Sequence, residues 1–260
     1  MHIEKSFGLI TQQGDHHECK IINLDYSNLQ EIYEIEMRAF KELDGQYIKK
    51  NMTFIGTCLA TECSVGIITK GEFIAIVTVN IEQIDNGERA SILGFNGKWP
   101  ALIGFIEGVY IFPKFRQCGL ISILYLEAIQ LLEKKKIKHI YSAIDPRNYV
   151  NIIAMMRSKF ILQNLYHSNI NGDLRYLMKF YPKEQFVTDM QKHISIDDHD
   201  AQRIYFKKGY VGIKLVGKDM EPHKTFGKYG EMKKPVTYMI LMRKLTVPNA
   251  YEKSFHRPGK

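Results

Sequence analysis

The sequence has few of the residues that define specialised protein classes. Its 260 residues include one tryptophan and four cysteines. Those four are too few for the disulfide framework of a small secreted protein, and their spacings match no zinc-binding pattern. The cysteines are Cys19, Cys58, Cys63 and Cys118. We therefore expect no metal site and a reducing, cytoplasmic setting.

Long hydrophobic runs are also lacking. The most apolar stretches extend to about ten residues, whereas a membrane-spanning helix needs about 20. The N-terminal segment has no apolar core of a signal peptide, so we expect no membrane partner. With 45% apolar and 25% charged residues, the composition is that of a globular protein, which excludes collagen-like and wholly disordered chains.

Charge is distributed unevenly along the chain. Residues 201–260 carry 14 Lys and Arg against 4 Asp and Glu, whereas the first 200 residues carry 22 against 24. An anionic partner should therefore favour the C-terminal end or a cleft that this end helps to line. RNA binding is one interpretation, but the region has no aromatic–basic motif of an RNA-binding module. Because a charge excess alone is more often a solvated surface, we do not expect nucleic acid as the partner.

Hydrophobic periodicity predicts a series of helices and strands. Helices are expected after Asp25, near Gly119, after Asp145 and before Lys208, with residues 46–62 irregular or a short helix, 85–100 a loop and 246–260 a loose tail. The expected strands are 65–68, 73–79, 105–112, 139–144, 161–166, 174–180, 210–216 and 235–245. The crossover helix between strands 105–112 and 139–144 implies a parallel pair. The prediction is an α+β (three-layer) fold with a mixed, mostly antiparallel central sheet flanked by helices.

The most informative segment runs from Val109 to Ile121. A strand ends at Pro113, a short basic turn follows, and a long helix begins at Gly119. Free amides at a helix start converge on one point, and the helix dipole adds positive charge there, which suits a phosphate or pyrophosphate. Gly119 allows a close approach to the backbone. The segment lacks both the Gly-Lys-Ser/Thr of a Walker motif and the three glycines of a dinucleotide fingerprint.

This segment resembles the pyrophosphate loop of the GNAT superfamily of acyl-CoA-dependent N-acetyltransferases. The family pattern is Arg/Gln-x-x-Gly-x-Gly/Ala after a strand and a Pro-x-x-Arg turn. Arg116, Gly119 and their spacing from Pro113 match this pattern. Ile121 departs from it, because Gly or Ala is usual at that position. The bulky side chain would narrow or shift the pyrophosphate site.

A second block is similar to the family segment that joins a strand, an Asn and a helix. Asn148 follows strand 139–144, and Phe160 lies twelve residues further on, although Lys159 replaces the usual Gly. Met155 stands where many members place the tyrosine that protonates the departing CoA thiolate, and methionine has no such proton. Residues 200–210 resemble the same block again, with Tyr205 at the tyrosine position.

The resemblance divides the chain into two parts. Residues 1–181 would form a GNAT-like acyl-CoA-binding domain. Residues 182–260 would form a C-terminal α/β extension that is a partial second GNAT-like unit with no second pyrophosphate loop. Alternatively, residues 145–195 are an elaboration and Tyr205 belongs to the working site. We favour the partial second unit.

The resemblance also implies the activity, which is direct transfer of an acetyl or other acyl group from acetyl-CoA to an amine of a small molecule or peptide. The implied CoA-binding residues are Val109, Tyr110, Ile111, Arg116, Gln117, Cys118, Gly119, Leu120, Ile121 and Asn148. The alternative is a non-catalytic GNAT-fold module that binds CoA or another anion. The acceptor, the acyl chain length and the oligomeric state, a homodimer included, stay open.

Two side chains are candidates for proton transfer, and each also has a structural interpretation. Glu107 lies in strand 105–112, and strand alternation predicts that it shares a face with Val109 and Ile111. It is either the general base or a surface acid near the strand end. Tyr205 is either the general acid or a helix tyrosine packed on the sheet. For Asn148 and Arg116 the corresponding structural roles are a helix N-cap and a solvated turn residue.

Overall fold

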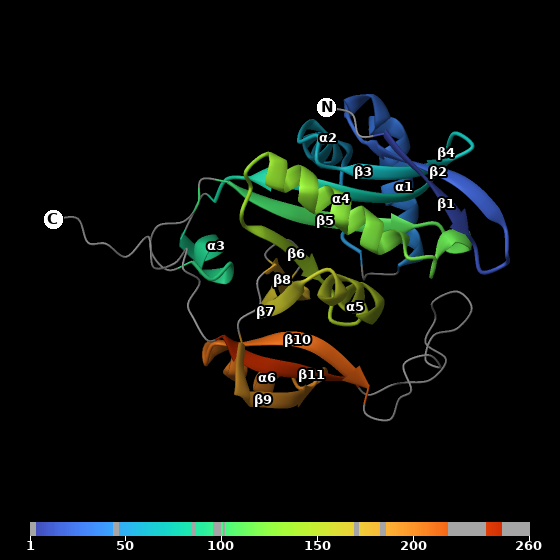
Figure 1. The fold of residues 1–260 in the computed structure, drawn as a ribbon. Coiled ribbons are helices and arrows are strands. Elements are labelled where there is room, and N and C mark those ends of the chain that lie inside the picture. The colour runs from blue at the N-terminus through green and yellow to red at the C-terminus, as the bar shows by residue number, and fades with distance from the viewer. Residues whose placement is uncertain are drawn as a thin grey trace.

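The computed structural model describes residues 4–43, 47–84, 87–95, 100, 102–168, 172–182, 186–217 and 238–245. These residues form one mixed sheet of eleven strands in the order β1-β2-β3-β4-β5-β6-β8-β7-β10-β11-β9 (Figure 1). The strands are β1 Glu4–Ile10, β2 His16–Asn23, β3 Val65–Thr69, β4 Glu72–Glu82, β5 Ile103–Ile111, β6 Ile140–Ile144, β7 Phe160–His167, β8 Leu174–Phe180, β9 Phe186–Ser195, β10 Tyr210–Gly217 and β11 Tyr238–Leu245. Pairing is antiparallel except between β5 and β6, so the predicted parallel pair is confirmed.

Helices cover both faces of this sheet and make the predicted three layers. The helices are α1 Leu29–Glu42, α2 Met52–Ala60, α3 Gly87–Ile92, α4 Leu120–Lys134, α5 Tyr149–Arg157 and α6 His199–Lys207, with single 3₁₀ turns η1 Tyr26–Asn28 and η2 Pro113–Phe115. One cluster of buried side chains joins α1 and α2 to the sheet, and a larger one joins α4, α5 and α6 to its opposite face (Figure 1). We call the first of these the α1/α2 face and the second the α4 face.

The predicted elements between residues 65 and 180 are confirmed with one exception. Residues 85–100 were expected to be a loop, but they contain α3, whose Ala90 is buried together with Leu93 against Phe105 of β5. A helix of six residues is too short to show a hydrophobic period, and the turn residues Asn86 and Gly87 conceal its start. Residues 235–237 of one expected strand and the expected tail lie outside the described residues.

Three strands had no prediction, namely β1, β2 and β9. In β2 the buried side chains are Cys19 and Ile21, and the neighbouring Glu18 and Lys20 are exposed. Such a half-polar edge hairpin gives little hydrophobic signal, because only one of its faces is covered. The predicted short helix in 46–62 is present as α2, whose first turn is capped by the Asn51 side chain at 2.8 Å from the Phe54 amide.

The C-terminal extension continues the sheet. Strand β10 runs antiparallel to β7, with Gly212 opposite Leu162, and β11 and β9 follow outward. In the described parts of the chain, no helix is long and apolar enough to cross a membrane. The same residues contain no group of three or more His, Cys, Asp or Glu side chains arranged to hold a metal ion.

Candidate active site

The turn between β5 and α4 has the backbone geometry of an anion site. Gln117 and Gly119 both lie in the left-handed region, at φ of +63° and +78°. The Ser122 amide donates to the Gly119 carbonyl at 3.1 Å, and within the described chain the preceding amides, from Cys118 to Ile121, have no main-chain acceptor. Left-handed residues that alternate with ordinary ones turn successive N–H groups toward a common point. These amides are therefore available to an anion at the positive end of the α4 dipole.

Position 119 requires a glycine because of its backbone conformation. A Cβ atom at this position would meet no atom within 4 Å, so the space in front of the turn is open. The positive φ, however, is strained for any residue with a side chain. The glycine thus fixes the turn and leaves room for a ligand to reach the amides.

The side chain of Arg116 makes contacts within the protein that the sequence did not predict. Its Nη2 lies 3.0 Å from Glu42 Oε2 at the end of α1, and its Nε donates to the Ile111 carbonyl at 3.0 Å. Its own amide donates to the Pro113 carbonyl at 3.3 Å. The Nε and Nη2 groups of Arg116 thus bind inside the protein and fasten the turn to β5 and α1. Glu42 lies 74 residues away in sequence and was not foreseen as a partner, and contact of Arg116 with the diphosphate stays a prediction.

Glu42 binds several side chains around Arg116, and we call this group the Glu42 corner of the site. Its carboxylate also accepts the Tyr110 hydroxyl at 2.8 Å and Arg38 Nε at 2.9 Å. Burial acts to raise the pKa of Glu42, but the bonds from Arg38 and Tyr110 and the charge of Arg116 outweigh it and lower that pKa. Burial and the neighbouring Glu42 raise the pKa of Tyr110 to about 12. Glu42 is therefore ionised and Tyr110 neutral at physiological pH, which keeps the corner intact.

Strands β5 and β6 separate at the level of this turn. They pair only from Gly104 with Ile140 to Ile106 with Ser142, and the Ser142 hydroxyl donates to the Ile106 carbonyl at 2.8 Å. The rest of β5 pairs with β4 alone in the described structure. We call the space between the two diverging strands the β5–β6 opening.

The backbone of β5 presents alternate groups to this opening. The Phe112 amide donates to Ile74 of β4 at 3.0 Å, so by alternation the main-chain groups of Val109 and Ile111 point away from β4. The Ile111 carbonyl is already the acceptor of Arg116. Val109 and the Ile111 amide are thus placed as predicted for an added strand, whereas Tyr110 points its main chain at β4 and its side chain at Glu42.

The strand alternation predicted for Glu107 is interrupted. The register of β4 and β5 shifts between Thr78 opposite Gly108 and Val79 opposite Ile106, so Glu107 is the extra residue of a β-bulge. Val109 and Ile111 pack on the α4 face. The charge of Glu107 acts instead on Tyr47 and Cys58, which belong to the α1/α2 side. A bulge interrupts strand alternation, and sequence gives no sign of it here.

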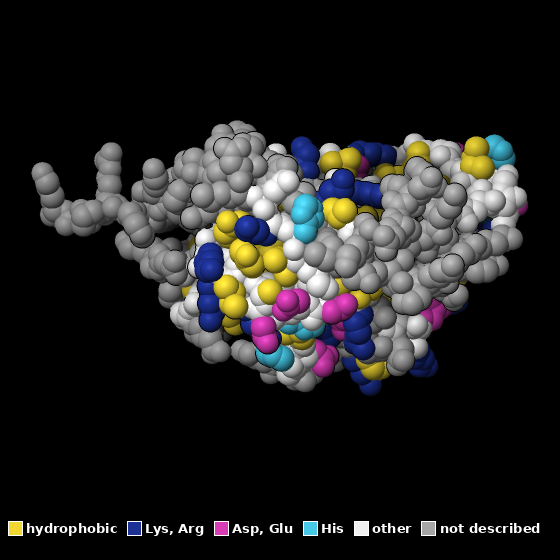
Figure 2. Space-filling model, turned by 90° about the horizontal axis from the view of Figure 1, so that it is seen from below, with side chains coloured by type: hydrophobic (Ala, Val, Ile, Leu, Met, Phe, Trp, Pro, Cys, Tyr) yellow, Lys and Arg dark blue, Asp and Glu magenta, His cyan; other side chains and the backbone are white. Residues whose placement is uncertain are grey.

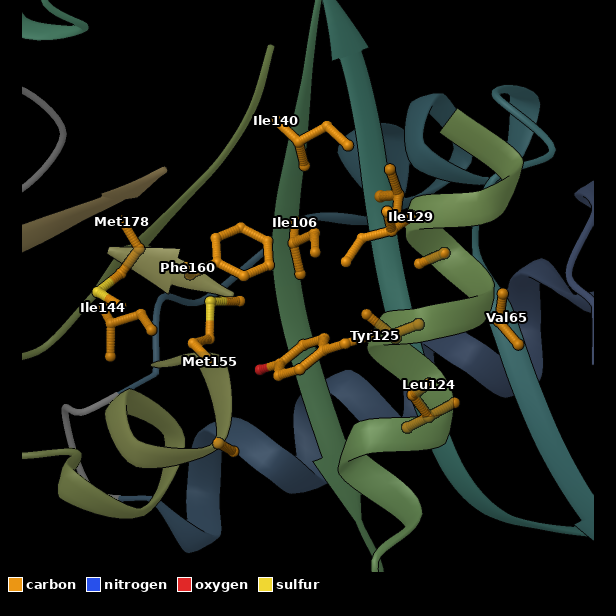
Figure 3. Close-up of a cluster of buried hydrophobic side chains, with 14 of the residues drawn as sticks. Val65, Ile106, Leu124, Tyr125, Ile129, Ile140, Ile144, Met155, Phe160 and Met178 are labelled. Atoms are coloured by element: carbon orange, nitrogen blue, oxygen red, sulfur yellow. The ribbon is translucent and has the colours of Figure 1, made fainter. Parts of the chain in front are cut away.

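The residues around the start of α5 were predicted in part. Asn148 is the N-cap, because its Oδ1 accepts the Asn151 amide at 3.2 Å. Met155 is fully buried in the core beside the β5–β6 opening, which is shown from the α4 side in Figure 3. Tyr125 of α4 points into the same region, and its hydroxyl bonds to Asn151 Oδ1. Sequence analysis did not single out Tyr125, and a hydroxyl among the apolar residues of α4 is the signal that could have found it.

Tyr205 is not brought to this opening. It lies on α6, packs edge-on against Tyr210 at 5.1 Å between ring centroids, and has Lys208 above its ring. Helix α6 packs over β7, β10 and β9, and strands β8 and β7 separate β6 from β10. The structure thus gives Tyr205 the packing role that was its alternative interpretation.

The described part of the C-terminal surface is mixed in charge. In the view of Figure 2, Asp and Glu side chains lie beside Lys and Arg, next to a group of apolar side chains. Arg203, for example, pairs with Asp200 at 3.1 Å. Of the 14 basic residues in 201–260, eight fall outside the described ranges. The described residues therefore add no argument for an RNA-binding surface.

Comparison with known proteins agrees with the geometry. Residues 29–157 match the model of the acetyltransferase (GNAT) family. A mosquito protein from Aedes aegypti that carries the name arylalkylamine N-acetyltransferase 7 has a similar structure, with a TM-score of 0.52 and 12% identity over 69% of this chain and 95% of that chain.

Two Arabidopsis thaliana structures are also similar, although less so. Naa50 with a CoA-peptide bisubstrate analogue has a TM-score of 0.49 and 14% identity over 63% of this chain and 98% of that chain. NAA60 with acetyl-CoA has a TM-score of 0.49 and 13% identity over 64% and 99%. Comparison with curated protein sequences gave no match. The family match over residues 29–157, together with the three-layer fold, the glycine turn before α4 and the β5–β6 opening, identifies this chain as a member of the GNAT acetyltransferase superfamily.

Proposed function

We propose that this protein transfers an acetyl group, or another acyl group, from acyl-CoA to an amine. The observation that carries the proposal is the succession of two binding features along one segment. The outer edge of β5 at Val109 and Ile111 leads directly into a turn whose amides, from Cys118 to Ile121, have no main-chain acceptor in the described chain. A strand edge suits the amides of a pantetheine arm, and a helix start suits a diphosphate.

The residues present fit this co-substrate. The amides from Cys118 to Ile121 hold the diphosphate, with Gly119 leaving the approach open. The main chain of Val109 and the Ile111 amide bind the pantetheine arm as an added strand, and Asn148 holds the start of α5 beside it. The bound acyl-CoA supplies an activated thioester at the β5–β6 opening.

Glu107 is the proposed general base. We place its side chain on the α1/α2 face, since the bulge interrupts strand alternation and its charge acts on Tyr47 and Cys58. The amine then approaches from that face, opposite to α4. Its carboxylate takes the proton that the amine must lose. We assign protonation of the released thiolate to water, since Met155 has no proton to give and Tyr205 lies over β10.

The amides of the turn are tested by Gly119→Glu. We expect acetyl-CoA affinity to fall at least tenfold in titration calorimetry, because the new carboxylate stands in front of the amides and the backbone is strained. The matched control is Gly172→Glu in the β7–β8 turn, where φ is +74° and a Cβ also meets no atom within 4 Å. The control should bind acetyl-CoA normally, and circular dichroism should show both variants folded. Equal affinity in the two variants would contradict the assignment of the turn.

A non-catalytic CoA-binding module is the second candidate, favoured by the buried Met155 at the position of the family's tyrosine. Thiol release from acetyl-CoA, measured over a panel of small amines and peptides, separates the two. Acceptor-dependent release supports the transferase. Tight acetyl-CoA binding without release for any acceptor supports the module.

A further inference from the structure

A buried ion pair lies behind the bulge of β5 on the α1/α2 face. Glu36 of α1 and Lys50, which precedes α2, are 1% and 6% exposed. Lys50 Nζ lies 2.8 Å from Glu36 Oε2, and the other oxygen of Glu36 accepts the hydroxyl of Thr78 in β4 at 2.9 Å. Lys50 also donates to the Tyr47 hydroxyl at 3.1 Å. A pair removed from water this completely costs several kcal/mol of desolvation, so an apolar pair would stabilise the fold at least as well.

The ammonium of Lys50 lies directly against the bulge. A Cβ added to Gly108 would lie 2.4 Å from Lys50 Nζ and within 2.1 Å of the Tyr47 hydroxyl. Any side chain at Gly108 would therefore collide with these groups. Gly108 adjoins Glu107, whose charge reaches the same Tyr47. An ammonium has three N–H groups, and Glu36 and Tyr47 receive two of them.

We infer that Lys50, held in place by Glu36, is a positioning residue that keeps the Glu107 carboxylate ionised and on the face from which the amine approaches. The inference rests on the proposed function, because it concerns the base of that reaction. A nearby cation favours the charged form of a carboxylate, most strongly where water is excluded. During the reaction an N–H bond of the amine breaks, the proton joins the Glu107 carboxylate, and water later removes it.

The other titratable groups around this point do not compete with Lys50. Burial is the main reason that the pKa values of Tyr47 and of Cys58 in α2 are raised, so both are neutral at physiological pH. Burial also raises the pKa of Tyr125 on α4. Lys50 and Glu36 are the other charged groups that act on Cys58 beside Glu107, and a Cβ at Gly108 would meet Lys50 first among these charged groups. The cation is thus the nearer charge to the bulge.

The test is the pH dependence of kcat/KM for thiol release. In the double variant Glu36→Gln/Lys50→Met the cation and its partner leave together, so no buried charge is stranded. We expect its acid limb to move to higher pH by about one unit, because Glu107 then ionises less readily. The single variant Glu36→Gln keeps the ammonium and an acceptor oxygen for it, and its acid limb should move to lower pH. The opposite signs separate an electrostatic role from general loss of packing.

Two further variants complete the experiment. Lys179→Met removes another buried lysine, 8% exposed, that lies over the rings of Phe95 and Tyr141, and its acid limb should match that of the unaltered protein. Acetyl-CoA affinity by calorimetry should be unchanged in all three charge variants.

Glu107→Gln, measured in parallel, distinguishes failure of the inference about Lys50 from failure of the base assignment in the proposed function. If it loses turnover while the double variant keeps the normal acid limb, the inference about Lys50 is overturned and the base assignment stands. If Glu107→Gln retains full turnover, the base assignment fails and the inference fails with it.

Discussion

Two regions of the sheet share the same order of helix and strands but differ in their buried side chains. The first is α5–β7–β8 and the second is α6–β10–β11, and their strands pair in mirrored order on either side of the β7–β10 contact. Both helices are nine residues long, and each is capped by a side chain that accepts an amide three residues on, Asn148 at 3.2 Å and Asp198 at 3.0 Å. The two caps are 50 residues apart.

The same offset of 50 relates the following residues. Lys159 and Gly209 end the helices with φ of +67° and +80°. Both following strands have a shift of register, after Leu162 in β7 and after Gly212 in β10. The correspondence supports the prediction that residues 182–260 contain a partial second unit.

The interiors differ at equivalent positions. In α5, Ile152 is fully buried among apolar side chains. In α6 the equivalent Gln202 is equally buried but bonds to the Tyr176 hydroxyl at 2.7 Å and to the Ser195 and Ile196 carbonyls at 2.8 Å. Only α5 starts beside the β5–β6 opening. The comparison teaches that the same succession of capped helix and irregular strand occurs twice in this sheet with different buried side chains, whereas the β5–β6 opening adjoins only the first.

A substitution at the contact between β7 and β10 should lower the free energy of unfolding more than the other changes considered below. A Cβ at Gly212 would lie 2.8 Å from Ile240 Cγ2 and 2.9 Å from Leu162 Cβ, so Gly212→Val overpacks the β7–β10 pair. We expect a loss of about 2 to 3 kcal/mol in the free energy of unfolding, measured with urea. The control is Gly8→Val in β1, where a Cβ meets no atom within 4 Å. If Gly212→Val is as stable as this control, the two units are not joined as described.

Loss of either helix cap should lower the stability of the protein by a similar amount, but only one of the two losses should weaken acetyl-CoA binding. Asn148→Ala and Asp198→Ala each remove one capping bond, so each should cost about 1 kcal/mol in urea unfolding. If Asn148 also holds the acyl-CoA arm, only its replacement raises the Kd for acetyl-CoA in calorimetry. Equal changes of Kd in both variants would remove the functional distinction between the two units.

The smallest effect is expected at the left-handed residues that end the helices. Lys159→Gly relieves a strained φ and should stabilise the protein by about 0.5 kcal/mol, after the entropy that glycine loses on folding is subtracted. The reciprocal change Gly209→Lys introduces the strain and should destabilise by about 1 kcal/mol. Thermal unfolding of both variants measures the difference. Shifts of Tm in the same direction would show that the two helix ends are not equivalent.

Much of the fold was predictable because its signals are local. The turn before α4 combines Pro113 and Gly119 within seven residues, and strands β3 to β8 each bury at least one face. The caps at Asn148 and Asp198 also depend on their own helices alone. Elements with little buried surface, such as β1, or with few residues, such as α3, gave no comparable signal.

The candidate site was less predictable because its geometry depends on distant partners. Arg116 pairs with Glu42, which lies 74 residues away at the end of α1. The Glu36–Lys50 pair is invisible in sequence, since a glutamate and a lysine 14 residues apart ordinarily lie in solvent.

By itself, the sequence determined the order of the helices and strands from β3 to β8 apart from α3, the glycine at the start of α4 and the family to which the chain is similar, because each depends on residues close together in the chain. The tertiary structure alone decided the break in strand alternation at Glu107, the partner of Arg116 and the distance of Tyr205 from the opening. A bulge in β5, a carboxylate on α1 and the order of strands in the sheet fix these three features. They arise only when segments far apart in sequence pack together, where burial and long-range pairing outweigh local preference.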